Sequence, residues 1–178
     1  MRYRRAYIQG GSYFFTVVTE KRRNIFAHTE NINRLRAAFR TVMKKRPFQI
    51  DAAVILPDHL HFIWTLPEHD SDFPTRWRLI KTAFTKDYPD KSSVLNVNRI
   101  KKNQQDIWQH RSWEHCLRDE KDFQQHVDYI HYNPVKHGLV KRASDWRYSS
   151  IHRYIRLGIL DEDWGGGEMV FDEGVSYE

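Results

Sequence analysis

Two periods of hydrophobic residues run along this chain, and they divide it into strands and helices. Residues 13–19, 48–56 and 59–66 are rich in aromatic and β-branched residues, which is typical of strands, and a tight turn makes the last two a hairpin. Residues 30–45 and 73–87 repeat apolar residues at spacings of three and four, which predicts amphipathic helices. The first half therefore has the predicted order strand, helix, hairpin, helix.

The second half adds one strand and further helices. Residues 107–113 predict a short fourth strand, and a helical pattern runs from Asp119 to Gly138, where glycine favours an end. Residues 88–105 are polar and predict a loop, and residues 146–157 predict a short final helix. This order predicts an α+β fold, a ferredoxin-like or RRM-like antiparallel sheet with packed helices, in which the first and third strands are central.

The third predicted strand carries a pair of histidines on one face. His59 and His61 are two residues apart, and side chains alternate across a strand with period two, so both imidazoles point the same way. Leu60, Phe62 and Trp64 alternate with them and are expected to face the packed helices. The histidines are therefore expected on the opposite face, in the middle of the sheet.

A tyrosine and an asparagine share one face of the late helix. Tyr129 and Asn133 are four residues apart, a spacing that aligns side chains on a helix. Tyr132 is the alternative nucleophile, but Lys136 stands four residues after it, and lysine is not a metal ligand. Asn133 precedes Pro134, which disfavours helical backbone, so Asn133 has a second reading as the cap of a new turn.

Together these residues predict a metal site beside a nucleophile. Two imidazoles and an amide oxygen, from His59, His61 and Asn133, leave open coordination positions for phosphate oxygens and water, which suits Mg²⁺ or Mn²⁺. Imidazole ligands alone would favour Zn²⁺. The Tyr129 phenolate would attack a phosphorus atom of a nucleic-acid strand. This step would give a 5′-phosphotyrosine and a free 3′-OH, and that 3′-OH or another could reverse it.

The charge is distributed unevenly along the chain. All 29 Lys and Arg residues lie at or before Arg156, and the 16 acidic residues before position 161 leave that part with a formal net charge of +13. The segment from Asp161 to Glu178 holds seven acidic residues and no Lys or Arg. A strongly basic body predicts a polyanionic partner. The acidic tail is expected either to cover the DNA-binding groove or to be a disordered, solubilising segment.

Other features exclude some classes of protein. No apolar run approaches the roughly 18–20 residues that span a membrane, and the apolar stretch after the basic start is too short for a signal peptide. Cys116 is the only cysteine, so no internal disulfide can form. A reducing cytoplasm is therefore the expected setting.

Four motifs carry a resemblance to a known family. They are Leu-Pro-Asp-His-Leu-His at 56–61, Ile-Trp-Gln-His-Arg-Ser-Trp-Glu-His at 107–115, Arg-Asp-Glu-Lys-Asp-Phe at 118–123 and Tyr-Ile-His-Tyr-Asn-Pro-Val-Lys-His-Gly-Leu-Val at 129–140. Over roughly residues 3–155 the chain resembles the REP-associated tyrosine transposases, single-tyrosine enzymes of the HUH endonuclease superfamily. The resemblance implies a catalytic domain over residues 1–158, with a flexible acidic tail over 159–178 outside it.

The resemblance also implies a substrate and roles for the motif residues. Family members bind imperfect palindromic, REP-like hairpins in single-stranded DNA and cut beside them. Tyr129 would then be the nucleophile, with His59, His61 and Asn133 as ligands of a divalent metal. Related insertion-sequence enzymes have glutamine at the Asn133 position, so this chain keeps the amide oxygen on a shorter side chain.

Basic and aromatic residues near the predicted strand ends are candidates for DNA contact. Each basic residue is equally compatible with a solvated surface role. Trp77 lies on an apolar stripe and is expected in the core. The candidates are Arg4, Arg5, Arg22, Arg23, Lys81, Lys86, Lys101, Lys102, Trp108, Arg111 and Lys136. Trp108 and Trp113 could stack on unpaired bases, a contact worth about 1–3 kcal/mol per base.

Three functions remain open at this point. A transposase predicts a covalent protein–DNA adduct. A non-catalytic, hairpin-binding module on an RRM-like sheet predicts binding that needs neither metal nor Tyr129. A phosphodiesterase that uses water predicts cleavage without an adduct. A homodimer is the simplest way to move DNA between two ends with one tyrosine per chain, whereas a single cut needs only a monomer.

Overall fold

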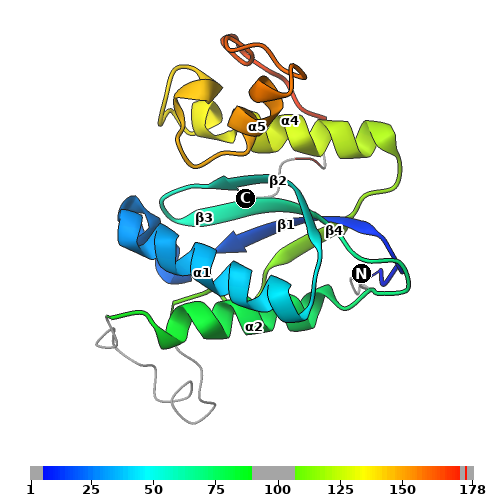
Figure 1. Ribbon diagram of the computed structural model, residues 1–178. Helices are drawn as coiled ribbons and strands as arrows, with labels where there is room; N and C mark the ends of the chain where they lie inside the picture. The colour runs from blue at the N-terminus through cyan, green and yellow to red at the C-terminus, as the bar shows by residue number, and fades with distance from the viewer. Residues whose placement is uncertain (1–5, 90–106, 173–174, 176–178) are drawn as a thin grey trace.

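A four-stranded antiparallel sheet forms the centre of the protein (Figure 1). The structure is a computed structural model, and it describes residues 6–89, 107–172 and 175. The strands are β1 (Ser12–Val18), β2 (Gln49–Ile55), β3 (His59–Thr65) and β4 (Trp113–Cys116). Their order across the sheet is β2-β3-β1-β4, so β1 and β3 are central, and the predicted ferredoxin-like topology is confirmed.

Helices cover both faces of the sheet (Figure 1). One layer contains α1 (Thr29–Lys45) and α2 (Phe73–Lys86), and the opposite layer contains α4 (Glu120–Lys136) and α5 (Ile151–Arg156). Short 3-10 turns lie at Glu20–Arg22, Ile25–Ala27 and Ala143–Asp145. No helix in the described ranges is long and apolar enough to cross a membrane.

Aromatic residues fill the layer between the sheet and the α1/α2 pair. Trp64 of β3 stacks on Trp77 of α2 with ring centroids 4.4 Å apart, and Phe39 of α1 stacks on Phe62 at 4.9 Å. All four side chains are buried, so Trp77 is a core residue as expected. Rings of this size bury a large apolar area each, which makes this layer a rigid support for the strands.

Capping residues fix the ends of the helices that matter for the site. The Asp119 side chain accepts a hydrogen bond from the Asp122 N–H at 2.8 Å and so starts α4. At the other end Gly138 has a φ of 67°, a conformation that favours glycine. Pro134 lies inside α4, only two residues before its end. The helix is therefore continuous through Asn133, and Asn133 does not cap a new turn.

Two predicted elements are displaced in the structure. The fourth strand is Trp113–Cys116 rather than residues 107–113. Ile107 and Trp108 have buried side chains, and near them the chain makes only an isolated bridge, between Trp108 and Thr19 just beyond β1. The final helix begins only at Ile151, because the residues before it pair with the outer edge of β2. There the Ile55 N–H donates to the Tyr148 carbonyl at 2.9 Å, and the Ser150 N–H donates to the Ala53 carbonyl at 2.8 Å.

Candidate active site

The two histidines of β3 lie under α4 and are shielded from solvent. His59 is 1% exposed and His61 is fully buried, and their ring centroids are 5.0 Å apart. Phe62 and Trp64 belong to the core of the α1/α2 face. The predicted alternation along β3 is therefore present, but the face that carries the histidines is covered by a helix.

Neighbouring polar groups orient each imidazole. His59 Nδ1 donates to the Asp58 carboxylate at 2.6 Å, and His61 Nδ1 shares a hydrogen bond of 2.9 Å with the Thr16 hydroxyl on the neighbouring strand. Because Nδ1 of His59 carries the proton, its Nε2 carries the lone pair. Metal-binding histidines in proteins are held in this way, through the ring nitrogen that does not face the metal.

Asp58 connects His59 to the loop after β1. Burial alone would raise the pKa of Asp58, but its hydrogen bonds and charge interactions with His59 and Arg22 outweigh burial and lower it. Arg22 lies 3.1 Å from the Asp58 carboxylate, and it has an unusual φ of 49°. The carboxylate therefore remains ionised at neutral pH and holds His59 in one orientation.

Helix α4 brings Tyr129 and Asn133 over the histidines. Both side chains are fully buried, and the Tyr129 ring lies 5.4 Å from the His61 ring at a steep angle. Phe14 of β1, which stacks on the His61 ring at 5.5 Å, also meets the Tyr129 ring edge-on at 6.0 Å. Tyr132 instead packs towards Phe171 at 5.8 Å. Of these ring contacts, the one that joins a tyrosine to a histidine of the His59/His61 pair is made by Tyr129.

Lys136 lies on the phenol of Tyr129. Its ammonium donates a hydrogen bond of 3.1 Å to the Tyr129 hydroxyl and lies 4.8 Å from the ring centroid. The sequence predicted Lys136 as a DNA contact, and its position beside Tyr129, the predicted nucleophile, was missed. The signal was present in the spacing, because residues seven apart lie on one side of a helix after two turns.

The donor set fits a small divalent ion. His59, His61 and Asn133 are two imidazoles and an amide oxygen, and all three side chains are buried, the histidines on β3 and Asn133 on α4. The Nδ1 hydrogen bonds of the two histidines leave Nε2 as the ligand nitrogen in each. Such a site offers few protein ligands and so keeps positions for substrate oxygens.

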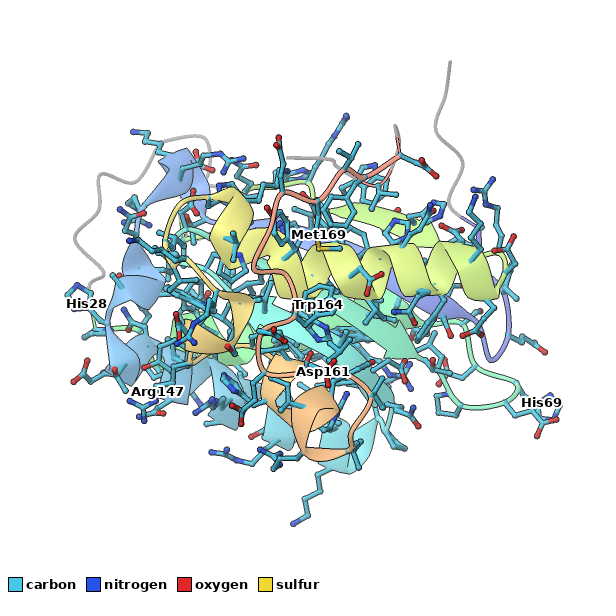
Figure 2. The ribbon with its side chains drawn as sticks, turned by 90° about the horizontal axis from the view of Figure 1, so that it is seen from above. His28, His69, Arg147, Asp161, Trp164 and Met169 are labelled. Atoms are coloured by element: carbon cyan, nitrogen blue, oxygen red, sulfur yellow. The ribbon has the colours of Figure 1, made fainter. Side chains whose placement is uncertain are left out.

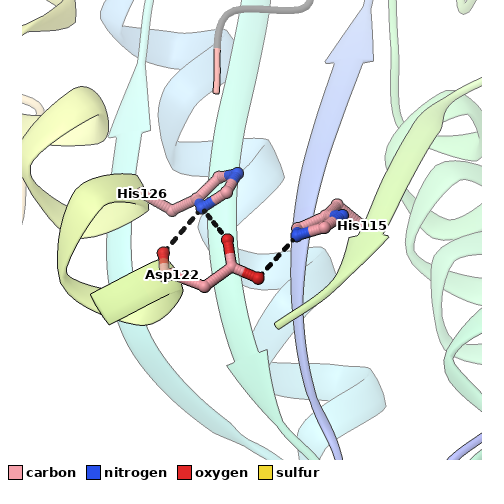
Figure 3. Close-up of side chains that lie close together, drawn as sticks. All are labelled: His115, Asp122 and His126. Carbon is pink, nitrogen blue, oxygen red and sulfur yellow. Dashed lines mark hydrogen bonds and ion pairs between the residues drawn. The ribbon is translucent and has the colours of Figure 1, made fainter. Parts of the chain in front are cut away.

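A second cluster of polar side chains lies beside this site and was not predicted (Figure 3). His115 of β4 donates to the Asp122 carboxylate at 2.8 Å, and His126 Nδ1 lies 3.2 Å from the other carboxylate oxygen. Ligand atoms of the three residues lie within 4.8 Å of one another, so the cluster could also hold a metal ion. The spacing of Asp122 and His126, four apart on α4, was the available signal.

Asp122 is already well supplied with hydrogen-bond donors. Arg118 donates to it from its backbone N–H at 3.0 Å and from its guanidinium at 3.1 Å. Burial alone would raise the pKa of Asp122, but the bonds from His115 and Arg118 outweigh burial and lower it. The cluster is a network of hydrogen bonds and ion pairs that connects β4 to the first turns of α4.

The ten basic residues among the predicted DNA contacts fall into three groups. Arg4, Arg5, Lys101 and Lys102 lie outside the described residues. Arg22, Lys86, Arg111 and Lys136 are exposed, and Arg23 and Lys81 are partly buried. Burial lowers the pKa of Lys81 to about 8.

Trp108 does not have the predicted role in this conformation. It is 7% exposed and packs between Phe26 and Phe84, with ring centroids 5.8 and 5.2 Å away. A ring enclosed by the core offers no free face to a base, so base stacking by Trp108 would need this packing to open.

Part of the acidic segment packs on the same face as Tyr129. Phe171 meets the Tyr129 ring edge-on at 5.4 Å, and Asp172 accepts a hydrogen bond from Gln125 at 2.6 Å. The Met169 N–H donates to the Tyr132 hydroxyl at 3.4 Å. Figure 2 shows this segment crossing α4 through Trp164 and Met169. Phe171 is therefore a direct neighbour of the predicted nucleophile.

The fold and the facing motifs define a DNA transposase of the HUH single-tyrosine class. The chain is 46% identical to the REP-associated tyrosine transposase of Escherichia coli K12, over 97% of this chain and 95% of the relative. A Haemophilus influenzae protein with the same family name is also 46% identical, over 92% of this chain and 93% of that protein. The chain belongs to the REP-associated tyrosine transposase family.

A solved structure supports the same assignment. A REP-associated tyrosine transposase bound to a REP hairpin superposes with a TM-score of 0.82 at 44% identity, covering 100% of this chain and 98% of that one. No protein-family model matches the chain.

Proposed function

We propose that this transposase is a metal-dependent endonuclease and strand transferase for single-stranded DNA, which binds REP-like hairpins and cleaves beside them through a 5′-phosphotyrosine. The observation that carries the proposal is the placement of Tyr129, whose ring lies 5.4 Å from the His61 ring and whose hydroxyl accepts a hydrogen bond from Lys136. A buried phenol with a cation on its oxygen and imidazoles beside it is suited to nucleophilic attack on phosphorus.

The step is a transesterification. The Tyr129 oxygen forms a bond to phosphorus, the bond from phosphorus to the 3′ oxygen of the DNA breaks, and that oxygen leaves as a 3′-OH after it takes up a proton. The 5′ end stays attached to Tyr129. Attack by a 3′-OH on the phosphotyrosine restores a phosphodiester and returns the phenol, so the reaction needs no nucleotide cofactor.

His59, His61 and Asn133 would hold the divalent ion, Mg²⁺ or Mn²⁺. When bound, the ion would supply Lewis-acid polarisation of the phosphate. Asp58 and Thr16 fix the two imidazoles, and the continuous helix fixes Asn133 relative to Tyr129.

Lys136 would assist by stabilising the phenolate. A positive charge 3.1 Å from the Tyr129 hydroxyl favours the charged form of that group. The phenol of an isolated tyrosine loses its proton only near pH 10, about three units above neutral. We therefore assign Lys136 to the nucleophile, in place of a contact to the DNA backbone.

Hairpin binding rests on the relatives and on charge. The related solved structure is bound to a REP hairpin, and this chain carries a net charge of +13 before the acidic segment. Positively charged proteins bind nucleic acid with an affinity that falls steeply with salt. A homodimer remains a prediction for transfer between two DNA ends.

The test is formation of a covalent adduct with a labelled hairpin oligonucleotide and Mn²⁺, measured on a denaturing gel. We expect an adduct with the natural protein and with Tyr132→Phe, and none with Tyr129→Phe. An adduct that persists in Tyr129→Phe would refute the nucleophile. Cleavage by the natural protein without an adduct would indicate a water-using phosphodiesterase, and binding without cleavage would indicate a non-catalytic module.

The role of Lys136 has a separate readout. Lys136→Gln is expected to slow adduct formation about tenfold or more at neutral pH, with recovery at higher pH, because the missing ammonium no longer favours the phenolate. Lys136→Arg keeps a cation and is expected to retain most of the rate. Equal slowing of both variants at every pH would contradict this role.

A further inference from the structure

A pocket opens between α1 and the segment that runs along the outer edge of β2. Its volume is about 340 Å³. Leu35 and Phe39 of α1 and Phe62 of β3 are among its lining residues, and all three side chains are buried. The pocket lies on the α1/α2 side of the sheet, whereas Tyr129 belongs to α4 on the other side.

Arginines surround the pocket. Arg36, Arg40 and Arg147 line it and are exposed, while no acidic residue does so in the described part of the chain. Arg36 and Arg40 are one helical turn apart on α1. The pocket therefore combines an apolar floor with a positively charged rim.

Tyr148 forms an aromatic wall that the fold holds in place. Its carbonyl accepts the Ile55 N–H at 2.9 Å, and its hydroxyl lies 3.0 Å from the Thr29 hydroxyl. The guanidinium groups of Arg36 and Arg147 lie 5.7 and 5.6 Å from its ring centroid. The aromatic ring and both guanidinium groups are thus gathered at one place.

These features fit one class of ligand. Unpaired bases are recognised by stacking on aromatic rings or guanidinium planes, while arginines neutralise the adjoining phosphates. The volume is at the lower end of the range for small-ligand pockets, which suits one base with its sugar. A base inside a duplex stem is stacked and paired, so it cannot enter such a pocket.

We propose that this pocket binds a single unpaired nucleobase of the DNA strand, with Tyr148 stacking on the base and Arg36, Arg40 and Arg147 contacting its phosphates. The proposal rests on the proposed function in that the substrate is single-stranded DNA. It concerns strand binding only and involves neither Tyr129 nor a metal ion. The pocket residues were not among the predicted DNA contacts.

Binding of two fluorescent single strands, measured by anisotropy without divalent metal, tests the proposal. One is a 12-nucleotide thymidine strand, and the other is an abasic strand of equal length and charge. Tyr148→Ala is expected to lose about tenfold in affinity for the thymidine strand and little for the abasic strand. Arg156→Ala removes a charge from an exposed position of α5 outside the pocket, and it should affect both strands equally.

A second variant keeps the test decisive if Tyr148→Ala folds poorly. Ala53→Leu adds bulk to the pocket lining without changing charge, and it should weaken thymidine binding selectively in a protein whose melting temperature is unchanged. If both pocket variants bind the two strands as the natural protein does, or lose both equally, the proposal is wrong. Adduct formation through Tyr129 is measured separately, so failure of one proposal is distinguishable from failure of the other.

Discussion

The two faces of the central sheet use the same strands for opposite purposes. On the α1/α2 face, Phe15, Phe62 and Trp64 pack with helix aromatics into an apolar core. On the α4 face the alternate positions include His59 and His61, which lie buried beside polar groups. Neighbouring residues of one strand thus contribute to the apolar core on one face and to the proposed metal site on the other, because consecutive side chains point to opposite faces.

The difference between the faces is also energetic. Burial of an apolar ring is favourable, whereas burial of an imidazole is costly unless its polar atoms are hydrogen-bonded. The described residues include four fully buried histidines. His59 and His61 lie on the side of β3 that faces α4, and His126 and His131 belong to α4 itself. The aromatic face therefore stabilises a sheet whose other face carries the proposed active site.

The largest expected effect is on the free energy of unfolding, compared between one variant on each face of the sheet. Trp64→Ala removes a fully buried ring that stacks on Trp77, and it should lower the free energy of unfolding by about 3–5 kcal/mol. His61→Leu, three residues away on the other face, takes the His61 hydrogen bond from the buried Thr16 hydroxyl and should lower the free energy of unfolding by about 1–3 kcal/mol, less than Trp64→Ala. Urea denaturation of both variants measures the difference.

His61→Leu completes the comparison through activity. It should abolish adduct formation while the protein stays folded. Equal destabilisation by Trp64→Ala and His61→Leu would show that the two faces are not divided in this way.

The next effect concerns the orientation of His59. Asp58→Asn weakens the acceptor of the His59 Nδ1 proton and the ion pair with Arg22, and it should reduce metal-dependent cleavage about 10- to 100-fold. Asp70→Asn is a matched control, since Asp70 pairs with Arg76 on the α2 side, and it should leave the cleavage rate of the folded protein unchanged. The measurement is adduct formation as a function of Mn²⁺ concentration, and a Mn²⁺ dependence unaffected by Asp58→Asn would contradict the orienting role.

Acid should weaken the α4 face selectively. Burial lowers the pKa of His131 to about 3, from an ordinary value near 6.5, so the unfolded chain takes up this proton first as the pH falls. Stability should therefore drop between pH 6.5 and 3, by roughly 2 kcal/mol from this residue between pH 7 and pH 5. His131→Gln should show a shallower decline in unfolding free energy over this range, and an identical decline would exclude His131 as the cause.

The smallest expected effect concerns the acidic segment. Deletion of the residues after Leu160 removes Phe171 from the Tyr129 ring and removes seven acidic residues. We expect cleavage at low salt to increase a few-fold as the basic body attracts DNA more strongly. Phe171→Ala in the full chain separates the ring contact from the charge. Unchanged cleavage after deletion would show that the segment has only a solubilising role.

Local periodicity in the sequence determined much of this protein. The period of two along residues 59–65 placed the histidines opposite Phe62 and Trp64, and the helical spacing chose Tyr129 with Asn133. These predictions needed only the geometry of one element, because an isolated strand or helix already decides which side chains share a face. The predicted topology also assigned the proposed metal ligands and nucleophile to two different elements, the third strand and the late helix.

The tertiary structure alone decided which side chains meet across elements. Packing enclosed Trp108 in the core, moved the fourth strand to Trp113–Cys116 and brought Phe171 onto Tyr129. It also joined His115 to the cluster on α4. Such contacts depend on how distant segments bury their apolar surface together, and no local pattern encodes that arrangement.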